Sequence, residues 1–92
     1  MKHDSQFEFD DNKSKTNKEK HEIDFVEAQD LWNDEAGVIF DARSEDEKRY
    51  ALVSKLSGKI WVMIFTLRGE AVRIISVRRA RKEEVRLYEQ DN

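Results

Sequence analysis

Three apolar segments separated by two short turn sequences dominate the C-terminal half of this chain, and they constrain its fold more than any other feature. The segments are residues 49–56, 60–67 and 72–77, and the turns are Ser57-Gly58 and Arg68-Gly69-Glu70. Turns of this length join neighbouring antiparallel strands. The pattern therefore predicts an antiparallel meander. Its central strand should be residues 60–67, the most apolar segment of the chain, covered on both faces.

Helical patterns come before this meander. Asp10 or Asp11 can cap a polar helix over residues 12–21, which has almost no apolar face and should lie at the surface. Asp24 and Glu27 are spaced as in a capping box. The apolar residues that follow predict a second helix with a buried stripe, which consists of Phe25, Ala28, Leu31 and Trp32.

Shorter elements complete the predicted fold. Residues 7–10 alternate in polarity as a short strand does, residues 38–40 are apolar, and residues 80–90 return to helical spacing. We expect an α+β fold in which the N-terminal helices pack on one face of the antiparallel sheet and a short helix ends the chain. Its 92 residues make one domain, with residues 1–6 as a frayed end.

The composition excludes several kinds of site. The chain has no cysteine, and its two histidines, His3 and His21, cannot alone form a usual zinc site. We expect neither a metal nor a cofactor. The N-terminus lacks the apolar core of a signal peptide, and no apolar run approaches the ~20 residues that span a bilayer. A cytoplasmic protein without membrane contact is the simplest expectation.

Charge is distributed unevenly along the chain. Residues 1–50 hold 8 basic and 15 acidic side chains, whereas residues 51–92 hold 9 basic and 5 acidic ones. Either the C-terminal half meets a polyanion or acidic partner, or the two halves neutralise each other within the fold. The charge count alone does not decide between these interpretations.

Cations gather where the last predicted strand ends. They are Arg73, Arg78, Arg79, Arg81 and Lys82. Guanidinium groups at a rigid strand end are well placed to bind phosphate. Arg68 lies in the preceding turn, and alternation does not decide whether Arg78 or Arg79 shares its face. The antiparallel arrangement also separates Arg78 from Arg68, so a phosphate between them would need long side chains or a third cation.

Five short motifs between residues 7 and 88 carry a resemblance to a known family. They are F-E-F-D-x-x-K at 7–13, N-x-x-K-H at 17–21, I-x-F-x-E-A at 23–28, E-x-R-Y at 47–50, and R-I-I-S-x-R-R-A with E-x-x-x-Y at 73–88. The chain resembles the BrnT toxins of bacterial type II toxin–antitoxin systems, which have a RelE-like ribonuclease fold. It departs from the family pattern at Phe9, Ser54 and Arg81, and Arg81 adds charge beside the expected site.

The resemblance implies a toxin that cleaves RNA, stops translation and is neutralised by a cognate antitoxin. That antitoxin would be a BrnA-like ribbon–helix–helix protein, and the toxin would meet operator DNA only through it. RNA supplies its own nucleophile in the 2′-hydroxyl group. Metal-free cleavage therefore needs only charge stabilisation, in-line positioning and proton transfer. Arginine suits the first two tasks because its fork binds phosphate oxygens.

The resemblance and the strand-end positions together select six candidate site residues. The expected catalytic residues are Arg68, Arg78 and His21. The expected substrate-binding residues are Arg79, Lys20 and Arg81. The arginines would contact the phosphate and the transition state, and an imidazole is a suitable acid or base near neutral pH.

Plainer structural roles compete with these assignments. His21 closes a polar helix, where a cation interacts favourably with the helix dipole. Lys20 can be a solvated surface lysine, and Arg49 can form a surface ion pair with Glu47. Ser76 lacks a His–Asp partner in the sequence, so we interpret it as a small spacer in a strand rather than a nucleophile.

Three functional hypotheses follow. The first is a toxin endoribonuclease. The second is a non-catalytic module that binds RNA or an antitoxin. The third is a DNA-binding regulator, which is the weakest because the sequence contains no helix-turn-helix pattern.

Overall fold

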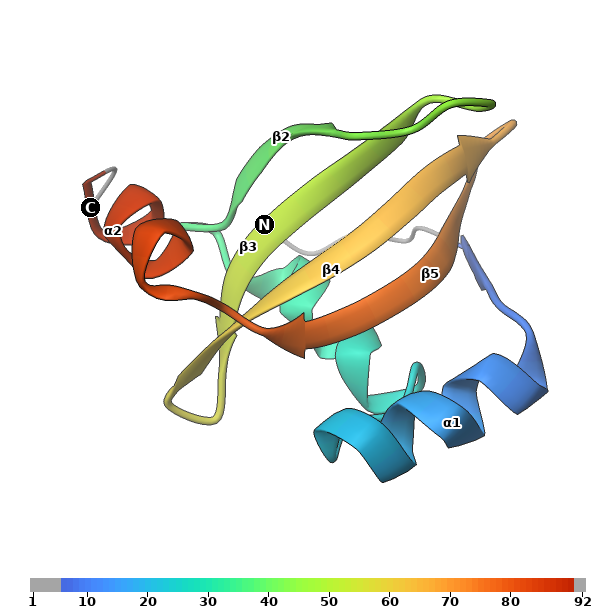
Figure 1. Cartoon of the computed structure of the whole chain (residues 1–92), viewed down its shortest axis with the longest axis horizontal. Coiled ribbons are helices and arrows are strands. Elements are labelled where there is room, and N and C mark those ends of the chain that lie inside the picture. Colours follow the sequence, from blue (N-terminus) through green and yellow to red (C-terminus); the bar gives the residue numbers. More distant parts are fainter. Residues whose placement is uncertain (1–5, 91–92) are drawn as a thin grey trace.

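The computed structural model describes residues 6–90, which form a five-stranded sheet with helical segments on both sides (Figure 1). The elements are β1 (Gln6–Glu8), α1 (Asp11–His21), the 3₁₀ helix η1 (Glu27–Asn33), β2 (Val38–Ala42), β3 (Arg49–Leu56), β4 (Lys59–Arg68), β5 (Ala71–Arg79) and α2 (Lys82–Gln90). The predicted α+β class is confirmed. Residues 1–5 of the expected frayed end lie outside the described residues, whereas Gln6 begins β1.

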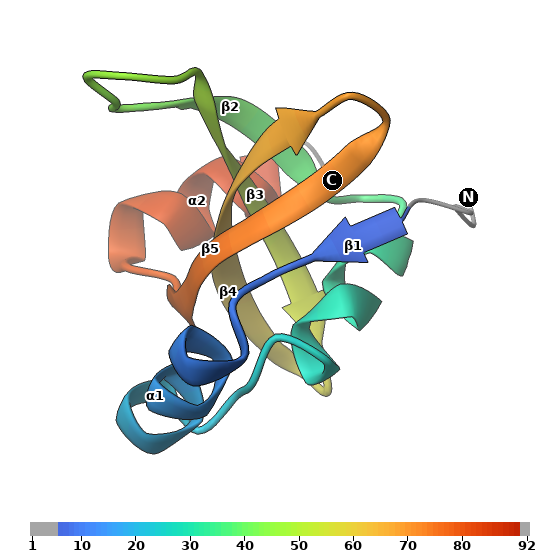
Figure 2. The same cartoon turned by 90° about the vertical axis from the view of Figure 1, so that its right-hand side faces the viewer.

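The sheet is mixed, so the expectation of a purely antiparallel sheet was wrong. Its strand order is β1-β5-β4-β3-β2, and β2 to β5 form an antiparallel meander. β1 lies parallel to β5, with Phe7 opposite Val72 (Figure 2). The local pattern at residues 7–10 predicts a strand but contains no information about a partner that lies far along the chain.

The turn between β3 and β4 has the geometry that the sequence predicts. Ser57 and Gly58 have φ angles of 53° and 78°. A two-residue hairpin turn with positive φ at both positions matches the right-handed twist of the flanking strands. This turn fixes the register of β3 on β4, in which Leu56 lies opposite Lys59.

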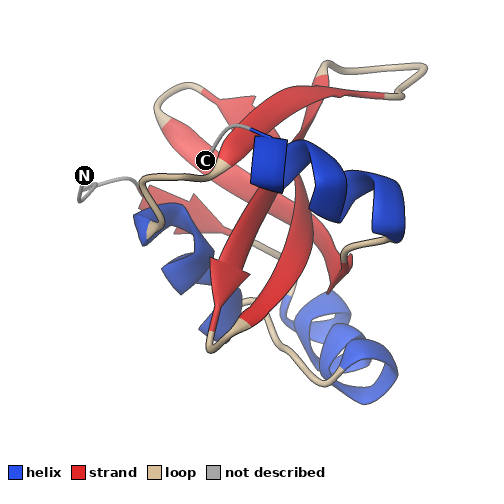
Figure 3. Ribbon diagram, turned by 90° about the vertical axis from the view of Figure 1, so that its left-hand side faces the viewer, coloured by secondary structure: helices blue, strands red, loops and turns tan. Residues whose placement is uncertain are grey.

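The two faces of the sheet are covered by different helices (Figure 3). On one face, which we call the η1 face, the larger core joins η1 to the sheet. Its buried side chains include Ala28, Leu31, Leu52, Trp61, Met63, Phe65, Ile74 and Val77. On the opposite face, which we call the α2 face, Tyr88 of α2 packs on Val53 and Val62. Within residues 6–90, no helix is both long and apolar enough to cross a membrane.

The second predicted helix is a 3₁₀ helix in the structure. The predicted capping box is present, because the Glu27 N–H donates to Asp24 Oδ1 at 2.7 Å and the Asp24 N–H donates to Glu27 Oε1 at 2.9 Å. Phe25, Ala28 and Leu31 are buried at a spacing of three residues. That spacing matches the three residues per turn of a 3₁₀ helix.

The first helix, α1, does not pack on a sheet face as expected, but lies along the edge of β5 (Figure 2). Asn17 is buried and bonds to the β5 backbone: its Nδ2 donates to the Val77 carbonyl at 2.9 Å, and its Oδ1 accepts from the Val77 N–H at 3.2 Å. Nδ2 also donates to the Ile23 carbonyl at 2.8 Å. The amide of Asn17 thus continues the hydrogen bonding of β5 beyond the end of β1.

Candidate nucleic-acid interface

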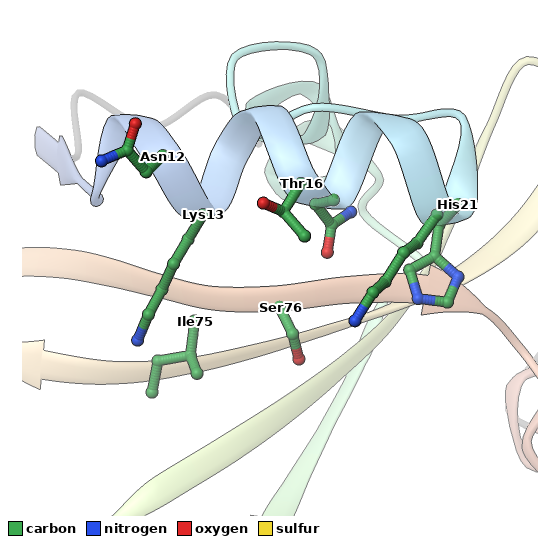
Figure 4. A pocket seen from close by; sticks show the side chains of 8 residues that line it. Asn12, Lys13, Thr16, His21, Ile75 and Ser76 are labelled. Atoms are coloured by element: carbon green, nitrogen blue, oxygen red, sulfur yellow. The ribbon is translucent and has the colours of Figure 1, made fainter.

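A groove of about 310 Å³ lies between α1 and β5, and cationic side chains line it (Figure 4). The cationic and polar residues on its α1 side include Lys13, Thr16, Lys20 and His21. Lys13, Thr16 and His21 point from α1 toward β5, where Ser76 and Ile75 form the opposite wall. We call this feature the α1–β5 groove.

The cap of α1 and its buried residues orient this cationic side. Asp10 caps α1 by accepting hydrogen bonds from the backbone of Asn12 and Lys13 at 2.8 and 3.0 Å. Ser14 is buried and accepts a hydrogen bond from the Phe25 N–H. Ser14 and Asn17 therefore face the protein, while Lys13, Lys20 and His21 are exposed as expected.

An irregularity in β5 places Ile75 and Ser76 at the surface. The register steps from Ile64 opposite Ser76 to Phe65 opposite Ile74, which leaves Ile75 as an extra residue of β5. Ile74 and Val77 are both buried, whereas Ile75 and Ser76 are half-buried. Simple alternation, which places Ile74 on the face of Ser76, was therefore wrong for this strand.

A second cavity, of about 560 Å³, opens on the α2 face of the sheet. Its floor contains one row of residues that runs across four strands, namely Phe40, Ala51, Ile64 and Ser76. Its walls carry Arg43 and Arg49 on one side and Arg78, Glu84 and Leu87 on the other. We call this feature the sheet cavity. It shares Ile75 and Ser76 with the α1–β5 groove, so the two hollows adjoin at the irregularity of β5.

Arg78 stands at the edge of the sheet cavity as part of an ion pair. Its Nη1 and Nη2 donate to the two carboxylate oxygens of Glu84, each at 2.8 Å, and both side chains are largely buried. The Glu84 hydrogen bonds raise the pKa of Arg78, and the Arg78 hydrogen bonds lower the pKa of Glu84. Both groups are therefore charged at neutral pH, and Glu84 holds the guanidinium in one orientation.

A third cavity, of about 270 Å³, adjoins the α1–β5 groove because Lys20 and His21 line both. Its other residues include Lys59, Trp61 and Arg79. The Arg79 guanidinium lies 5.5 Å from the centre of the Trp61 ring. The structure thus brings Lys20, His21 and Arg79 together, on the η1-face side of β5.

Arg68 and Arg81, two of the six predicted site residues, line none of these three hollows. Arg68 is opposite Ala71 and Arg78 is opposite Val62, so they project from the same sheet face but are separated by six residues along β4, or roughly 20 Å. Arg68 instead lies 3.9 Å from Glu47 in an exposed pair. Arg81 is exposed before α2, and its N–H donates to Glu84. Arg68 and Arg78 therefore do not converge on one phosphate position, although both were expected to contact it.

Several residues of these hollows were not predicted from the sequence. Lys13 lines the α1–β5 groove, although its motif gave it no role, and Ser76 lies between the two hollows. Arg49 lines the sheet cavity, whereas Glu47, its expected partner, pairs with Arg68. The Arg49 Nε is buried and has no hydrogen-bond partner among the described residues. Helical spacing could have placed Lys13 with Lys20, because seven residues make two turns.

A scan against protein-family models matches residues 9–84 to the ribonuclease toxin, BrnT, of type II toxin–antitoxin systems. The chain belongs to this family. The match extends from the residue before the Asp10 cap to Glu84, and it includes all six predicted site residues. A search of the curated proteins found no match.

Membership of the BrnT family states the kind of activity but not the residues that perform it. The family is described as a ribonuclease toxin of a toxin–antitoxin pair, which implies an RNA target and an antitoxin partner. The described residues contain no group of three metal-ligating side chains. The α1–β5 groove and the sheet cavity are therefore the natural places to look for RNA contacts, because cations line both.

Proposed function

We propose that this protein is an endoribonuclease that needs no metal and cleaves RNA through attack of the 2′-hydroxyl group on the adjacent phosphate. The observation that carries this proposal is the convergence of cations from α1, β3 and β5 on two adjoining hollows at Ile75 and Ser76. A phosphate backbone that follows the α1–β5 groove would pass Lys13, Lys20 and His21.

The proposed chemistry assigns roles to cations of the α1–β5 groove, the sheet cavity and the third cavity. The 2′-hydroxyl group loses its proton to water as its oxygen forms a bond to phosphorus. The bond from phosphorus to the 5′-oxygen breaks, that oxygen takes up a proton, and a 2′,3′-cyclic phosphate remains. Arg78 stabilises the charge on the non-bridging oxygens, and its orientation is fixed by Glu84. His21 donates the proton to the leaving oxygen. Lys13, Lys20 and Arg79 hold flanking phosphates, with Arg81 as an outer contact.

The proposed biological effect follows from the family. Cleavage of messenger RNA in the cytoplasm would stop translation, and a ribbon–helix–helix antitoxin would neutralise the toxin and carry the pair to operator DNA. We also propose a common fold with the RelE-like ribonucleases. The meander of β2 to β5 with α1 at its edge supports this assignment.

A direct test is incubation of the purified protein with single-stranded RNA in EDTA. We expect wild-type protein to produce 2′,3′-cyclic phosphate ends. Arg78→Ala should lower single-turnover cleavage by about 100-fold or more. His21→Ala should also lower the rate, because the proton donor is lost. Lys15→Ala, an exposed change on α1, should act as wild type. Intact RNA at high enzyme excess, or products with 3′-hydroxyl ends, would overturn the proposal.

Arg68→Ala tests whether the cleavage site lies at Arg78 or at Arg68. Arg68 lies six residues along β4 from Val62, the partner of Arg78, so we expect Arg68→Ala to have a small effect on cleavage. If Arg68→Ala abolishes cleavage and Arg78→Ala does not, the site lies at the β4–β5 turn and the role proposed for Arg78 is wrong.

A second candidate function is a binding module without catalysis. It is favoured by the pairing of Arg78 with Glu84, which neutralises the best-placed guanidinium. Such a module would bind RNA with a steep salt dependence and leave it uncut.

A further inference from the structure

The sheet cavity has an apolar floor, which phosphate binding does not require. Ala51 and Ile64 lie side by side on β3 and β4 and are only half-buried. Leu87 of α2 is 41% exposed at the wall. Two residues further along these strands, Val53 and Val62 are buried with Tyr88 of α2, whereas Ala51 and Ile64 pack against this cluster and stay partly exposed. An apolar surface is thus open beside a cationic rim.

The rim carries three arginines, which donate hydrogen bonds, together with the carboxylates of Asp41 and Glu84. Arg43 and Arg49 stand on one side of the floor and Arg78 stands on the other. Arg78 is engaged by Glu84, whereas the Arg49 Nε is a buried donor with no partner among the described residues. A planar ligand with acceptor atoms on its edge suits such a rim better than an alkyl side chain does.

The position of the cavity links it to the proposed path of RNA. Ile75 and Ser76 form a wall of both the sheet cavity and the α1–β5 groove. A nucleotide whose phosphate lies at Arg78 would therefore have the cavity floor within reach of its base. The volume of about 560 Å³ is within the usual range for small-molecule sites.

We propose that the sheet cavity is a nucleobase subsite, which takes one unstacked base of single-stranded RNA on its floor. This proposal rests on the proposed function, since it assigns a substrate contact to the same ribonuclease. Unpaired RNA bases are bound in this way, on apolar surface with polar groups at the rim. A free nucleotide should therefore bind tighter than phosphate alone.

The test is titration of the full-length protein with the four nucleoside 3′-monophosphates and with inorganic phosphate, followed through backbone amide shifts. We expect at least one nucleotide to bind about tenfold tighter than phosphate, because a base contributes that much on an apolar platform. The affected amides should include those of Ala51, Ile64 and Ile75. Ala51→Leu fills the floor and should remove this advantage, while phosphate binding stays unchanged.

Leu87→Ala provides a second variant if Ala51→Leu does not fold, and it should weaken nucleotide binding about threefold. Leu67→Ala is its matched control, because Leu67 is similarly exposed at 52% but lies outside the cavity. Nucleotides that bind no tighter than phosphate would overturn the subsite. An unchanged nucleotide advantage in Ala51→Leu, or in Leu87→Ala where Ala51→Leu does not fold, would overturn it as well.

Cleavage of RNA separates this proposal from the proposed function. If wild type cuts RNA but nucleotides bind no tighter than phosphate, only the subsite is wrong. If wild type binds nucleotides at Ala51 but never cuts RNA, the ribonuclease assignment is wrong and the base-binding site remains.

Discussion

Arg78 and Glu84 form two parallel hydrogen bonds of 2.8 Å, so the strand-end arginine of the candidate site is already engaged by a carboxylate from α2. Glu84 also accepts a hydrogen bond from the Arg81 N–H and thus anchors the start of α2. A phosphate group that binds Arg78 must therefore share the guanidinium with Glu84 or displace it. This pair orients Arg78, and it also reduces the charge that RNA meets.

Glu84→Gln should tighten binding of single-stranded RNA, because it removes the carboxylate that competes with phosphate. If one phosphate contact is gained, the slope of log affinity against log salt should steepen by about 0.7. Glu89→Gln, an exposed change on the same helix, is the control for net charge. Fluorescence anisotropy over a series of salt concentrations measures the RNA affinity and its salt slope for each variant. An equal effect of the two variants would mean that Arg78 does not contact phosphate.

Lys13→Ala and Lys15→Ala form a matched pair on α1. Lys13 lines the α1–β5 groove, whereas Lys15 is exposed away from it. We expect Lys13→Ala to weaken RNA binding and to make the salt slope shallower by about 0.7, since one phosphate contact is lost. Lys15→Ala should change neither quantity by a measurable amount. Equal losses in both variants would show that only the general charge of α1 matters.

Asn17→Ala should destabilise the fold by about 2–3 kcal/mol, because it leaves buried backbone groups of Val77 and Ile23 without their partner. Asn12→Ala removes an exposed amide from the same helix and should be nearly neutral or slightly stabilising. Urea unfolding of both variants gives the comparison. A loss in Asn17→Ala below about 0.5 kcal/mol, the usual limit for a surface site, would contradict the role of this amide.

The strands of the meander were predictable because their signals are local. Residues 49–56 form β3 as expected, and the Ser57-Gly58 turn sets its pairing with β4. Asp10 was one of two predicted caps, with Asp11 as the alternative, and Asp24 with Glu27 was predicted as a capping box. Both predictions use side chains within three residues of their partners. These features depend on short spacings that a sequence displays directly.

The site was harder to predict because its geometry depends on distant partners. Asn17 is polar in a polar helix, and only the backbone of Val77 on β5 explains its burial. The extra residue Ile75 reverses the alternation of β5, and no local signal marks it. Arg68 and Arg78 are both strand-end arginines in the sequence, but pairing of β4 with β5 places them at opposite ends of the ladder.

The hydroxyl group of Tyr88 donates to Asp34 Oδ2 at 2.7 Å and ties α2 to the segment after η1. Burial and the Asp34 hydrogen bond raise the pKa of Tyr88 to about 12. Burial opposes ionisation of Asp34. Its hydrogen bonds from Tyr88, Ala36, Ser54 and Lys55 nevertheless keep the pKa of its carboxyl group below the usual value. The pair is therefore a neutral phenol that donates to a carboxylate.

Tyr88→Phe should lower the free energy of unfolding at pH 8 by about 1–3 kcal/mol, because a buried hydrogen bond to a charged group is lost. The pKa of Tyr88 is higher in the folded state than its ordinary value of 10.0, so this contribution is complete below pH 10 and is lost as the pH rises toward 12. The difference between wild type and Tyr88→Phe should accordingly shrink over that interval. Urea unfolding at pH 8, 10 and 11 measures this difference. Ionisation of the other tyrosine, Tyr50, does not affect the comparison, because both proteins contain it. A difference that stays constant up to pH 11 would show that the phenol ionises alike in the folded and unfolded chain.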